Sequence, residues 1–509
     1  MSEQHGQPAT LVVRCPATGE PLAEVACASH AAVERAAAAA RLAQRDWAAL
    51  GVAARLQELV RFRDVLVAST DTLVDTLVSE TGKARQEALL HELFLLLDYI
   101  TWLVDRASVE LAPTDVELHL LKHRRSTVRY EPRALTGVIA PWNYPLLIPF
   151  TGAMAALATG SAALVKPSEH TPLTALLVER LWNDAALPKA LLQVLVGSPP
   201  TAQALIAQVD QVLFTGSVAN GRLVAQACAA RLIPCVLELG GLAPLVVLND
   251  ADLERTAQAI CFGAFTNAGQ ACISVERVYA QRGIYPAVAE RVTQLAAQLR
   301  VGDPRRKHVD VGAITVAAQA ETALAHIADA IDRGARITSG GRMLPGPGRF
   351  LPPTVLTGCD STMRVMREES FAPIAPLMPF DSIDEGIALA NDSSLGLAAY
   401  LFTSSSEVAE RIAPRLDAAS VLVNDVMSHY AAPEVPLTGI KESGLGSVHG
   451  ADALRQLCQL RHINTPRLPA LGRDPTWFPY SATSYALGRR ALRSWFSSRG
   501  WLRRARELF

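Results

Sequence analysis

Short apolar segments alternate with segments of helical length between residues 135 and 238, and this rhythm constrains the fold more than any other feature of the sequence. The apolar segments are 135–140, 162–166, 192–196, 211–215 and 234–238. Strands that alternate with helices form a parallel sheet with helices on both faces. A further apolar segment, 244–248, begins a second region of this kind that continues to about residue 430. The sequence therefore predicts an α/β protein.

The segments that flank this rhythm have other patterns. Residues 31–48 are rich in Ala with helical spacing, and long helical patterns continue over residues 53–109. Residues 117–134 are shorter, alternating and β-prone, and Pro132 places them at a sheet edge or a strand end. Residues 459–464 are also β-prone. We therefore expect β structure outside the main sheets.

The composition narrows the class of protein. Apolar residues make up 50% and charged residues 19% of the 509 residues, which supports a large core. The 48 Lys and Arg nearly balance the 49 Asp and Glu, so no basic field attracts nucleic acid and we expect no such partner. The eight Cys form no C-x-x-C pair and no disulfide framework. Since the N-terminus also lacks the apolar core of a secretory signal, we expect a reducing, cytoplasmic compartment.

Two segments raise the question of a membrane. No charged residue occurs from Ala134 to Val165, but Pro141, Pro145 and Pro149 interrupt this run, so a buried strand, a loop and a core helix explain it better than a bilayer span. The C-terminal residues 485–509 hold seven Arg interleaved with bulky apolar residues. Such a basic helix lies on an anionic membrane surface or packs against its own subunit or a neighbour.

Polar or small residues follow several of the predicted strands. They are Asn143, Lys166 and Glu169, Gly216 and Ser217, and Glu238. In open parallel sheets the ligand binds beyond the carboxyl ends of the strands. There an Asn amide can donate a hydrogen bond, a Lys and a carboxylate can hold ribose hydroxyls, and a Gly turn that opens a helix can bind phosphate. The G-x-G-x-x-G fingerprint is absent.

Each of these residues also has a purely structural explanation. The segment Pro141–Pro145 can be a rigid turn, and Ser168 with Glu169 can form an ordinary helix start. Glycine is common in turns between a strand and a helix. Glu238 can be a core glutamate that accepts hydrogen bonds from backbone amides.

Glu238 and Cys272 are the candidate catalytic side chains. A carboxylate at the end of an apolar strand is desolvated, which raises its pKa toward that of a useful base. Cys272 has small and polar neighbours in Asn267–Cys272, so a substrate can approach it closely. At a helix N-terminus or near a cation its thiolate would be favoured, and the thiolate is the nucleophile. Most Cys are nevertheless simply buried in packing.

The order of these elements resembles the aldehyde dehydrogenase superfamily from about residue 10 to residue 465. The resemblance rests on Glu238-Leu239-Gly240-Gly241, on Gly269-Gln270-Ala271-Cys272 and on Glu368-Glu369-Ser370-Phe371-Ala372-Pro373. It extends to Asn391, Leu395-Gly396-Leu397, Asn424 and Pro436-Leu437-Thr438-Gly439-Ile440-Lys441-Glu442-Ser443-Gly444. The first two motifs at this spacing are highly specific for the family.

The resemblance implies a Rossmann-type cofactor domain, an α/β catalytic domain and a β oligomerisation arm. The cofactor domain would comprise residues 1–115 and 133–240, and the catalytic domain 241–440. The arm would comprise 116–132 and 459–466, and a homodimer or homotetramer is expected. A basic extension, 467–509, lies outside the family core, and some relatives use such tails for membrane attachment.

The resemblance also implies residue roles. Cys272 would attack the aldehyde, Asn143 and the Cys272 backbone N–H would stabilise the oxyanion, and Glu238 would activate the water that hydrolyses the thioester. The cofactor-binding residues would be Ile139, Trp142, Lys166, Glu169, Gly216, Ser217, Glu369 and Phe371. Because Glu169 would repel a 2′-phosphate that Lys166 would tolerate, we expect NAD, with NADP possible. No metal is implied.

The substrate and two alternative functions are less constrained. The residues expected to line the substrate pocket are mostly apolar, which favours medium-chain or aromatic aldehydes over charged semialdehydes; they are Tyr144, Leu147, Ile148, Ala271 and Ile273. One alternative is acyl transfer to coenzyme A, although those relatives commonly lack the base equivalent to Glu238. Another is a non-catalytic binding or structural protein.

The second alternative rests on four departures from the family pattern near the cofactor loops. They are Leu242 for the usual Lys, Ala372 for Gly, Leu437-Thr438 for Phe-Gly, and a lack of Gly in 197–202 apart from Gly197.

Overall fold

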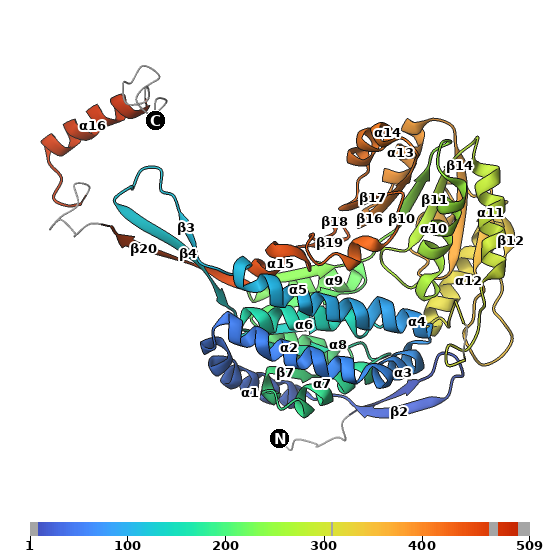
Figure 1. Ribbon diagram of the computed structural model, residues 1–509, viewed down its shortest axis with the longest axis horizontal. Coiled ribbons are helices and arrows are strands. Elements are labelled where there is room, and N and C mark those ends of the chain that lie inside the picture. Colours follow the sequence, from blue (N-terminus) through green and yellow to red (C-terminus); the bar gives the residue numbers. More distant parts are fainter. Residues whose placement is uncertain (1–8, 307–308, 468–476, 497–509) are drawn as a thin grey trace. The chain divides into compact units, whose positions relative to one another are not determined.

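The computed structural model describes residues 9–306, 309–467 and 477–496 (Figure 1). Contacts divide these residues into two units. The first unit holds the residues up to Ala112 and Tyr130–Gln459, and the second holds Pro113–Arg129 and the residues from Leu460 onward. The first unit contains both large sheets, so the functional residues predicted from the sequence all lie in it.

The first large sheet confirms the predicted α/β rhythm. Its strand order is β19-β9-β8-β5-β6-β7, and every neighbouring pair is parallel except β19 with β9. The strands are β5 (Leu135–Ile139), β6 (Ala162–Lys166), β7 (Leu192–Val194), β8 (Gln211–Thr215), β9 (Cys235–Glu238) and β19 (Gly444–Leu445). Every residue of β5 and β6 is buried, because helices cover both faces, and this explains why these strands are continuous apolar runs.

Helices from the N-terminal half and from between the strands cover this sheet. They are α1 (His30–Ala49), α2 (Val52–Ala68), α3 (Thr70–Thr81), α4 (Arg85–Glu87), α5 (Leu95–Glu110), α6 (Leu147–Thr159), α7 (Leu173–Asp184), α8 (Pro199–Gln208), α9 (Val218–Ala230) and α15 (Gly450–Gln456). A π-helical segment, Ala88–Phe94, joins α4 to α5. The ribbon β1 (Thr10–Arg14) and β2 (Pro21–Ala26) precedes α1.

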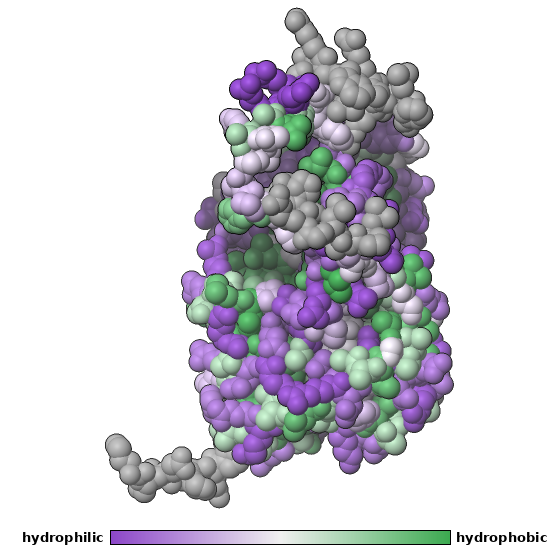
Figure 2. Space-filling model, turned by 90° about the vertical axis from the view of Figure 1, so that its left-hand side faces the viewer, coloured by the Kyte–Doolittle hydropathy of each residue, from purple (hydrophilic) through white to green (hydrophobic). Residues whose placement is uncertain are grey.

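The uncharged run from Ala134 to Val165 forms β5, the following loop, α6 and most of β6. Helix α6 is buried on almost every side, which confirms a core helix. In the described ranges no helix is both long enough and apolar enough to cross a bilayer. Figure 2 shows hydrophilic residues over much of one face, with smaller hydrophobic patches between them.

The second large sheet has the order β12-β13-β14-β11-β10-β16-β17 and is parallel except for β12. Its strands are β10 (Ala243–Val247), β11 (Val275–Gln281), β12 (Arg336–Ser339), β13 (Thr354–Thr357), β14 (Ile374–Phe380), β16 (Ala398–Phe402) and β17 (Ser420–Val423). Alternate residues of β10 belong to different cores: Leu245 packs with α10 (Leu253–Phe265) and α11 (Tyr285–Gln298). Val246 packs with α12 (Ala317–Asp332), α13 (Ile383–Asn391) and α14 (Ser406–Ile412). Both faces are therefore covered, as predicted.

Shorter elements complete this unit. They are the pair β15 (Leu395–Gly396) and β18 (Ile440–Lys441), and the 3₁₀ turns Lys189–Leu191, Thr266–Gly269, Arg364–Met366, Ala413–Arg415 and Ser428–Ala431.

The second unit contains a three-stranded sheet with the order β20-β4-β3. Its strands are β3 (Thr114–Val116), β4 (Arg124–Pro132) and β20 (Cys458–Pro466), of which β4 and β20 extend into the first unit. The β prediction over 117–134 was too long, because residues 117–123 connect β3 to β4. Of the basic tail, α16 (Ala482–Phe496) is helical, and residues 468–476 and 497–509 lie outside the described residues.

Candidate active site

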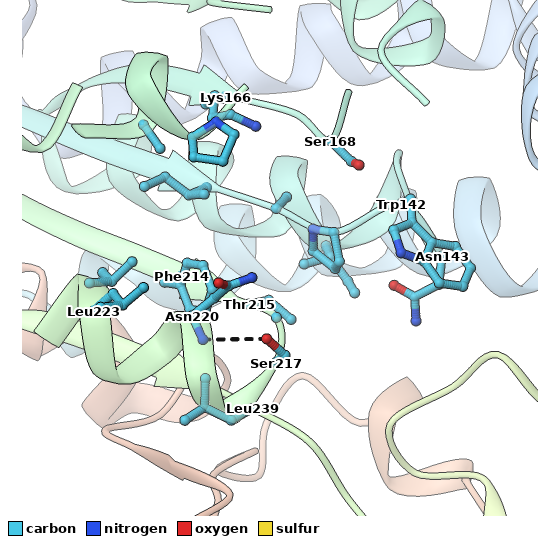
Figure 3. A pocket seen from close by; sticks show the side chains of 18 of the residues that line it. Trp142, Asn143, Lys166, Ser168, Phe214, Thr215, Ser217, Asn220, Leu223 and Leu239 are labelled. Atoms are coloured by element: carbon cyan, nitrogen blue, oxygen red, sulfur yellow. Dashed lines mark hydrogen bonds between the residues drawn. The ribbon is translucent and has the colours of Figure 1, made fainter. Parts of the chain in front are cut away.

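A cleft lies at the carboxyl ends of β5, β6 and β8, and we call it the main cleft (Figure 3). Its volume is about 560 Å³, in the range of small-molecule sites. The cleft brings together Asn143, Cys272 and all the residues expected to bind a cofactor: Ile139, Trp142, Lys166, Glu169, Gly216, Ser217, Glu369 and Phe371. Residues that are up to 232 positions apart, from Ile139 to Phe371, therefore share one site.

Lys166 is the last residue of β6, and Glu169 lies on the loop that follows this strand. The Nζ of Lys166 is 3.6 Å from the Glu169 carboxylate and donates a hydrogen bond to the Pro167 carbonyl at 2.8 Å. Burial lowers the pKa of Lys166, against the opposing effect of Glu169. Helix α7 begins only at Leu173, so Ser168 and Glu169 do not form a helix start. The pair is therefore placed to bind a diol rather than to cap a helix.

The start of α9 forms a second part of the main cleft. Ser217 is the N-cap, and its Oγ accepts a hydrogen bond of 3.4 Å from the backbone N–H of Asn220, drawn as a dashed line in Figure 3. First-turn N–H groups have no partner within a helix, and together with the helix dipole they favour an anion. A Cβ on Gly221 would lie 2.4 Å from the Leu239 side chain, so a larger residue there would displace Leu239, which lines the main cleft.

An apolar slot between α8 and α9 adjoins this anion site. It is lined by Ala202, Ile206, Leu223, Val224 and Ala227. A diol site, an anion site and an apolar slot in one cleft fit the ribose, the pyrophosphate and the adenine of a dinucleotide. The residues present therefore fit such a cofactor.

The loop that carries Glu369 and Phe371 closes another side of the main cleft. Glu369 accepts a hydrogen bond of 3.2 Å from the Gly241 N–H, and burial raises its pKa to about 7. The Phe371 ring meets Trp142 edge-on at 5.5 Å between centroids. Glu276 fixes this loop, because its carboxylate accepts hydrogen bonds from the backbone N–H groups of Ser370 and Phe371.

Cys272 follows a strained turn. Asn267 and Ala268 have φ values of 51° and 53°, and a Cβ on Gly269 would lie 2.1 Å from the Ala372 carbonyl oxygen. Burial, followed by the nearby Glu369 and Glu238, raises the pKa of the Cys272 thiol to about 12. The conditions that would favour a thiolate are therefore not met, because Cys272 lies in a turn ahead of β11 and its charged neighbours are carboxylates.

Glu238 ends β9 and is 6% exposed. Within the described residues its Oε1 has no hydrogen-bond partner, so the explanation of a satisfied core glutamate fails. Burial raises its pKa well above the ordinary value. Glu238 and Cys272 line a smaller cavity of about 40 Å³, which we call the inner cavity. Cys272 also lines the main cleft, so this residue borders both cavities.

Asn143 is 4% exposed and lies beside the Cys272 segment. Its Nδ2 donates to the Gln270 carbonyl at 2.9 Å. The backbone carbonyl of Asn143 accepts hydrogen bonds from Lys83 Nζ at 2.8 Å and from Asn267 Nδ2 at 3.1 Å. The amide that could donate to a substrate oxygen is thus fixed through both its side chain and its backbone.

The inner cavity is lined mostly by apolar side chains. Its other lining residues are Val138, Ile139, Ile148, Thr151, Gly152, Leu213, Phe214, Thr215, Ile273, Leu397, Tyr430, Leu437 and Val448. Of the residues expected to line a substrate pocket, Ile148 and Ile273 do so. Leu147 lines an adjoining cavity that shares Thr151 and Tyr430 with the inner one, whereas Tyr144 lies beneath Lys83 and Ala271 lines neither cavity.

Three of the departures from the family pattern lie at buried or cavity-lining positions. The Ala372 methyl is buried in the second-sheet core, and Leu437 lines the inner cavity. Leu242 is buried, and its carbonyl accepts a hydrogen bond from Arg277 Nε at 3.1 Å.

Several charged residues that hold the site were not singled out from the sequence. They are Lys83, Glu87, Glu92 and Glu276, all of them buried. The spacing of Glu80, Lys83 and Glu87 gave no usable signal, because Lys83 lies between α3 and α4 and the three residues do not share one helical face.

Comparison with known proteins identifies relatives over nearly the whole chain. The sequence profile of the aldehyde dehydrogenase family matches residues 3–463. A 4,4'-diapolycopene aldehyde oxidase from Methylomonas sp is 37% identical over 94% of this chain and 89% of its own length. A Mycolicibacterium smegmatis protein named as a succinate-semialdehyde dehydrogenase with NADP(+) is 35% identical over 90% of this chain and 89% of its own.

A solved structure has the same fold. The NAD+ complex of an aldehyde dehydrogenase from Bacillus cereus superposes with a TM-score of 0.86 at 30% sequence identity, covering 90% of this chain and 93% of that one.

Proposed function

The chain belongs to the aldehyde dehydrogenase family, and on that premise we propose that it oxidises apolar aldehydes to carboxylic acids with NAD through an acyl group on Cys272. The observation that carries the proposal is the position of Cys272. This residue borders both the main cleft, which fits a dinucleotide, and the inner cavity, which holds Glu238.

The first step is attack of the Cys272 sulfur on the aldehyde carbon, which forms a thiohemiacetal. Asn143 Nδ2 and the Cys272 backbone N–H donate hydrogen bonds to the oxygen as its negative charge develops. Removing one such donor typically costs about 10²–10³-fold in rate. When bound in the main cleft, NAD(P) would supply the acceptor for the hydride that leaves the carbon, so that a thioester remains on Cys272.

Within the main cleft, Lys166 and Glu169 bind the adenosine ribose, and the N–H groups at the start of α9, with Ser217, bind phosphate. Glu369 binds the nicotinamide ribose, and Ile139, Trp142, Gly216 and Phe371 complete the site. NAD is preferred, because the Glu169 carboxylate repels a 2′-phosphate.

Glu238 completes the reaction by activating the water that hydrolyses the thioester. Its raised pKa and its unpartnered oxygen support this role, since a general base needs a pKa near the working pH and room for water beside it. The runner-up is acyl transfer to coenzyme A. Glu238→Gln is expected to give one burst of reduced cofactor and then stall, and robust acyl-coenzyme A formation by the wild type would overturn hydrolysis.

The inner cavity favours apolar substrates. Glu238 is its one charged lining residue in the described part of the chain, and no Lys or Arg is present there to pair with a substrate carboxylate. Medium-chain or aromatic aldehydes are therefore preferred to succinic semialdehyde, although one relative is named for that compound.

Nicotinamide reduction, followed by absorbance over a panel of aldehydes with NAD and NADP, tests the proposal. Cys272→Ala is the control and should abolish turnover. A strong preference for succinic semialdehyde would contradict the substrate assignment. Absence of turnover with every aldehyde would favour a binding or structural protein.

The domain roles and the assembly belong to the same proposal. Residues 1–115 and 133–240 bind NAD(P), 241–440 carry catalysis, and 116–132 with 459–466 form an arm through which a homodimer or homotetramer assembles in the cytoplasm. The sheet β20-β4-β3 supports the arm. Light scattering after size-exclusion chromatography tests the assembly, and a monomer would contradict it.

The tail 467–509 makes peripheral membrane contact. On α16, Tyr485, Leu492 and Phe496 share one helical face and are each at least 60% exposed, and the helix contains Arg489, Arg490 and Arg493 but no acidic residue. Such a helix fits an anionic lipid surface. Cosedimentation with phosphatidylserine vesicles, lost when residues 482–509 are deleted, is expected; equal binding after the deletion would contradict it.

A further inference from the structure

A buried ion pair lies beneath the loop that carries Asn143. Lys83 Nζ and a Glu92 carboxylate oxygen are 2.5 Å apart, and both side chains are fully buried. Lys83 lies between α3 and α4, and Glu92 lies in the π-helical segment that follows. Neither side chain lines the main cleft or the inner cavity, so neither touches a substrate or cofactor there.

The two members of the pair hold the middle and the end of the same loop. Lys83 Nζ donates to the Asn143 carbonyl at 2.8 Å and lies 4.1 Å from the centroid of the Tyr144 ring. A Glu92 oxygen accepts the N–H groups of Leu146 at 2.8 Å and Leu147 at 3.1 Å, at the start of α6. The segment between β5 and α6 is therefore fixed at its middle and at its end.

A neighbouring contact links this loop to the nucleophile. Glu87 accepts the Asn267 N–H at 2.6 Å, and Asn267 Nδ2 donates to the Asn143 carbonyl at 3.1 Å. The Asn143 carbonyl thus receives one hydrogen bond from Lys83 and one from the turn that precedes Cys272. Lys83 and Glu87, four residues apart, therefore fix the position of Asn143 relative to the turn that precedes Cys272.

We propose that Lys83 is a positioning residue for the oxyanion site, acting through the Asn143 carbonyl with Glu92 as its counterion. The proposal rests on the proposed role of Asn143. Stability alone does not explain the pair, because well-packed apolar residues can replace a buried ion pair with little or no loss. An apolar replacement cannot donate to the Asn143 carbonyl.

The expected effect lies in the chemical step. A misplacement of about 1 Å in a catalytic group can cost about 10²-fold in rate. Loss of the Lys83 donor is therefore expected to lower kcat about 10- to 100-fold, with the KM for NAD unchanged, because the cofactor residues keep their places.

The test variant is Lys83→Met/Glu92→Gln. Met fills the apolar volume of Lys83, and the Gln oxygen still accepts the N–H groups of Leu146 and Leu147, so the Glu92 charge is not left alone. Glu87 loses Lys83 as a nearby cation but keeps its hydrogen bonds from Ala84, Thr266 and Asn267. If this variant does not fold, Lys83→Gln/Glu92→Gln, whose amides can pair with each other, takes its place. The matched control is Arg55→Met, since Arg55 is also buried and donates to the Ala158 carbonyl at the far end of α6.

Three measurements separate positioning from general damage. The burst of nicotinamide reduction reports oxyanion formation and hydride loss, and it should slow in the double variant. Alkylation of Cys272 by iodoacetamide forms no oxyanion, so its rate should stay within about twofold of wild type. Cofactor binding, followed by fluorescence, should also be retained. Arg55→Met should lose thermal stability while its burst rate is kept.

The outcomes are distinct. A slow burst with normal alkylation and normal cofactor binding supports the proposal. A double variant that keeps the wild-type burst rate overturns it, as does an Arg55→Met enzyme with an equally slow burst. A wild-type enzyme that reduces no cofactor with any aldehyde would instead refute the proposed function.

Discussion

The Glu276 carboxylate accepts a hydrogen bond of 2.9 Å from the backbone N–H of Phe371, a residue whose φ is 48°. Its other oxygen accepts the Ser370 N–H at 3.1 Å. A non-glycine residue in this region of backbone space costs about 1–3 kcal/mol and persists only where its surroundings impose it. Glu276 therefore imposes the conformation that brings Glu369 and Phe371 into the main cleft.

Replacing Glu276 by Ala should weaken cofactor binding. Two buried N–H groups would lose their acceptor, at about 1–3 kcal/mol each, and the loop would leave its strained conformation. We expect the Kd for NAD, measured by fluorescence titration, to rise about tenfold or more. Glu385→Ala is the control, because Glu385 also accepts backbone N–H groups but does so at the start of α13, outside the cleft. An unchanged Kd in Glu276→Ala would refute the role of Glu276.

The stability of the ligand-free protein should fall as the pH rises above neutrality. Burial raises the pKa of Glu80 and Glu369 to about 7 and that of Glu276 to about 8, from 4.5. A carboxyl whose folded pKa is raised contributes stability that is present at low pH and lost as the pH rises through the folded pKa. His429 and His449, with pKa values lowered to about 4, act in the opposite direction only below pH 6.5.

From pH 6.5 to about 8 the two histidines no longer act, and the decline comes mainly from Glu276, since Glu80 and Glu369 have lost most of their contribution near pH 7. The Cys235 thiol, whose pKa Cys228 lowers to about 7, acts in the opposite direction in this range, so Cys235→Ser is the parent protein for the test. Differential scanning fluorimetry at constant ionic strength should show a falling Tm across this range. Glu276→Gln should flatten the decline, because the amide cannot ionise, and a Tm of the Cys235→Ser protein that is constant or rises would contradict the raised pKa values.

Glu238→Gln should speed alkylation of Cys272 even as it blocks turnover. The Glu238 carboxylate is among the groups that raise the pKa of the thiol to about 12, so its removal lowers that pKa and increases the thiolate fraction. At pH 8 we expect an iodoacetamide rate about two- to tenfold higher than in wild type. A slower reaction would instead mean that Glu238 takes the proton of Cys272 during attack.

Glu169→Gln should shift the cofactor preference toward NADP. The substitution removes the charge that repels a 2′-phosphate and frees Lys166, 3.6 Å away, to pair with it. We expect the ratio of kcat/KM for NADP to that for NAD to rise about tenfold, which corresponds to about 1.4 kcal/mol. Asp184→Asn, which removes an acidic charge at the far end of α7, outside the cleft, serves as the control. If both variants change the ratio equally, the effect is one of net charge.

The sequence contained much of the fold because the strands of the first sheet are buried on both faces. A strand such as 162–166 must then be apolar up to its last residue, Lys166, and turn residues bound it. The polar residues that follow these strands, from Asn143 to Glu238, were recognisable because each interrupts or ends an apolar segment. The helix expected to start at Ser168 starts at Leu173, because local capping signals cannot reveal that Glu80, 93 residues earlier, accepts the first N–H of α7.

Residues such as Lys83 and Glu276 could not be identified in this way. A charged side chain is usually exposed to solvent. Lys83 and Glu276 are buried here because they hydrogen-bond with partners 60 and 95 residues away, Asn143 and Phe371. The thiol environment of Cys272 was likewise hidden, because the carboxylates that surround it come from β9 and from the 368–371 loop. Long-range charge pairing, rather than local pattern, decided these cases.

The position of Cys272 between two cavities has a consequence for evolution and for inhibition. Residues of α8 and α9 line the main cleft alone, and Tyr430 lines the inner cavity and not the main cleft, whereas Ile148 of α6 lines both. Related enzymes can therefore change their aldehyde substrate by substitutions in the inner cavity, while the main cleft and the cofactor that it binds stay the same. For the same reason, a molecule that binds in the inner cavity beside Cys272 would inactivate the enzyme without competing with the dinucleotide in the main cleft.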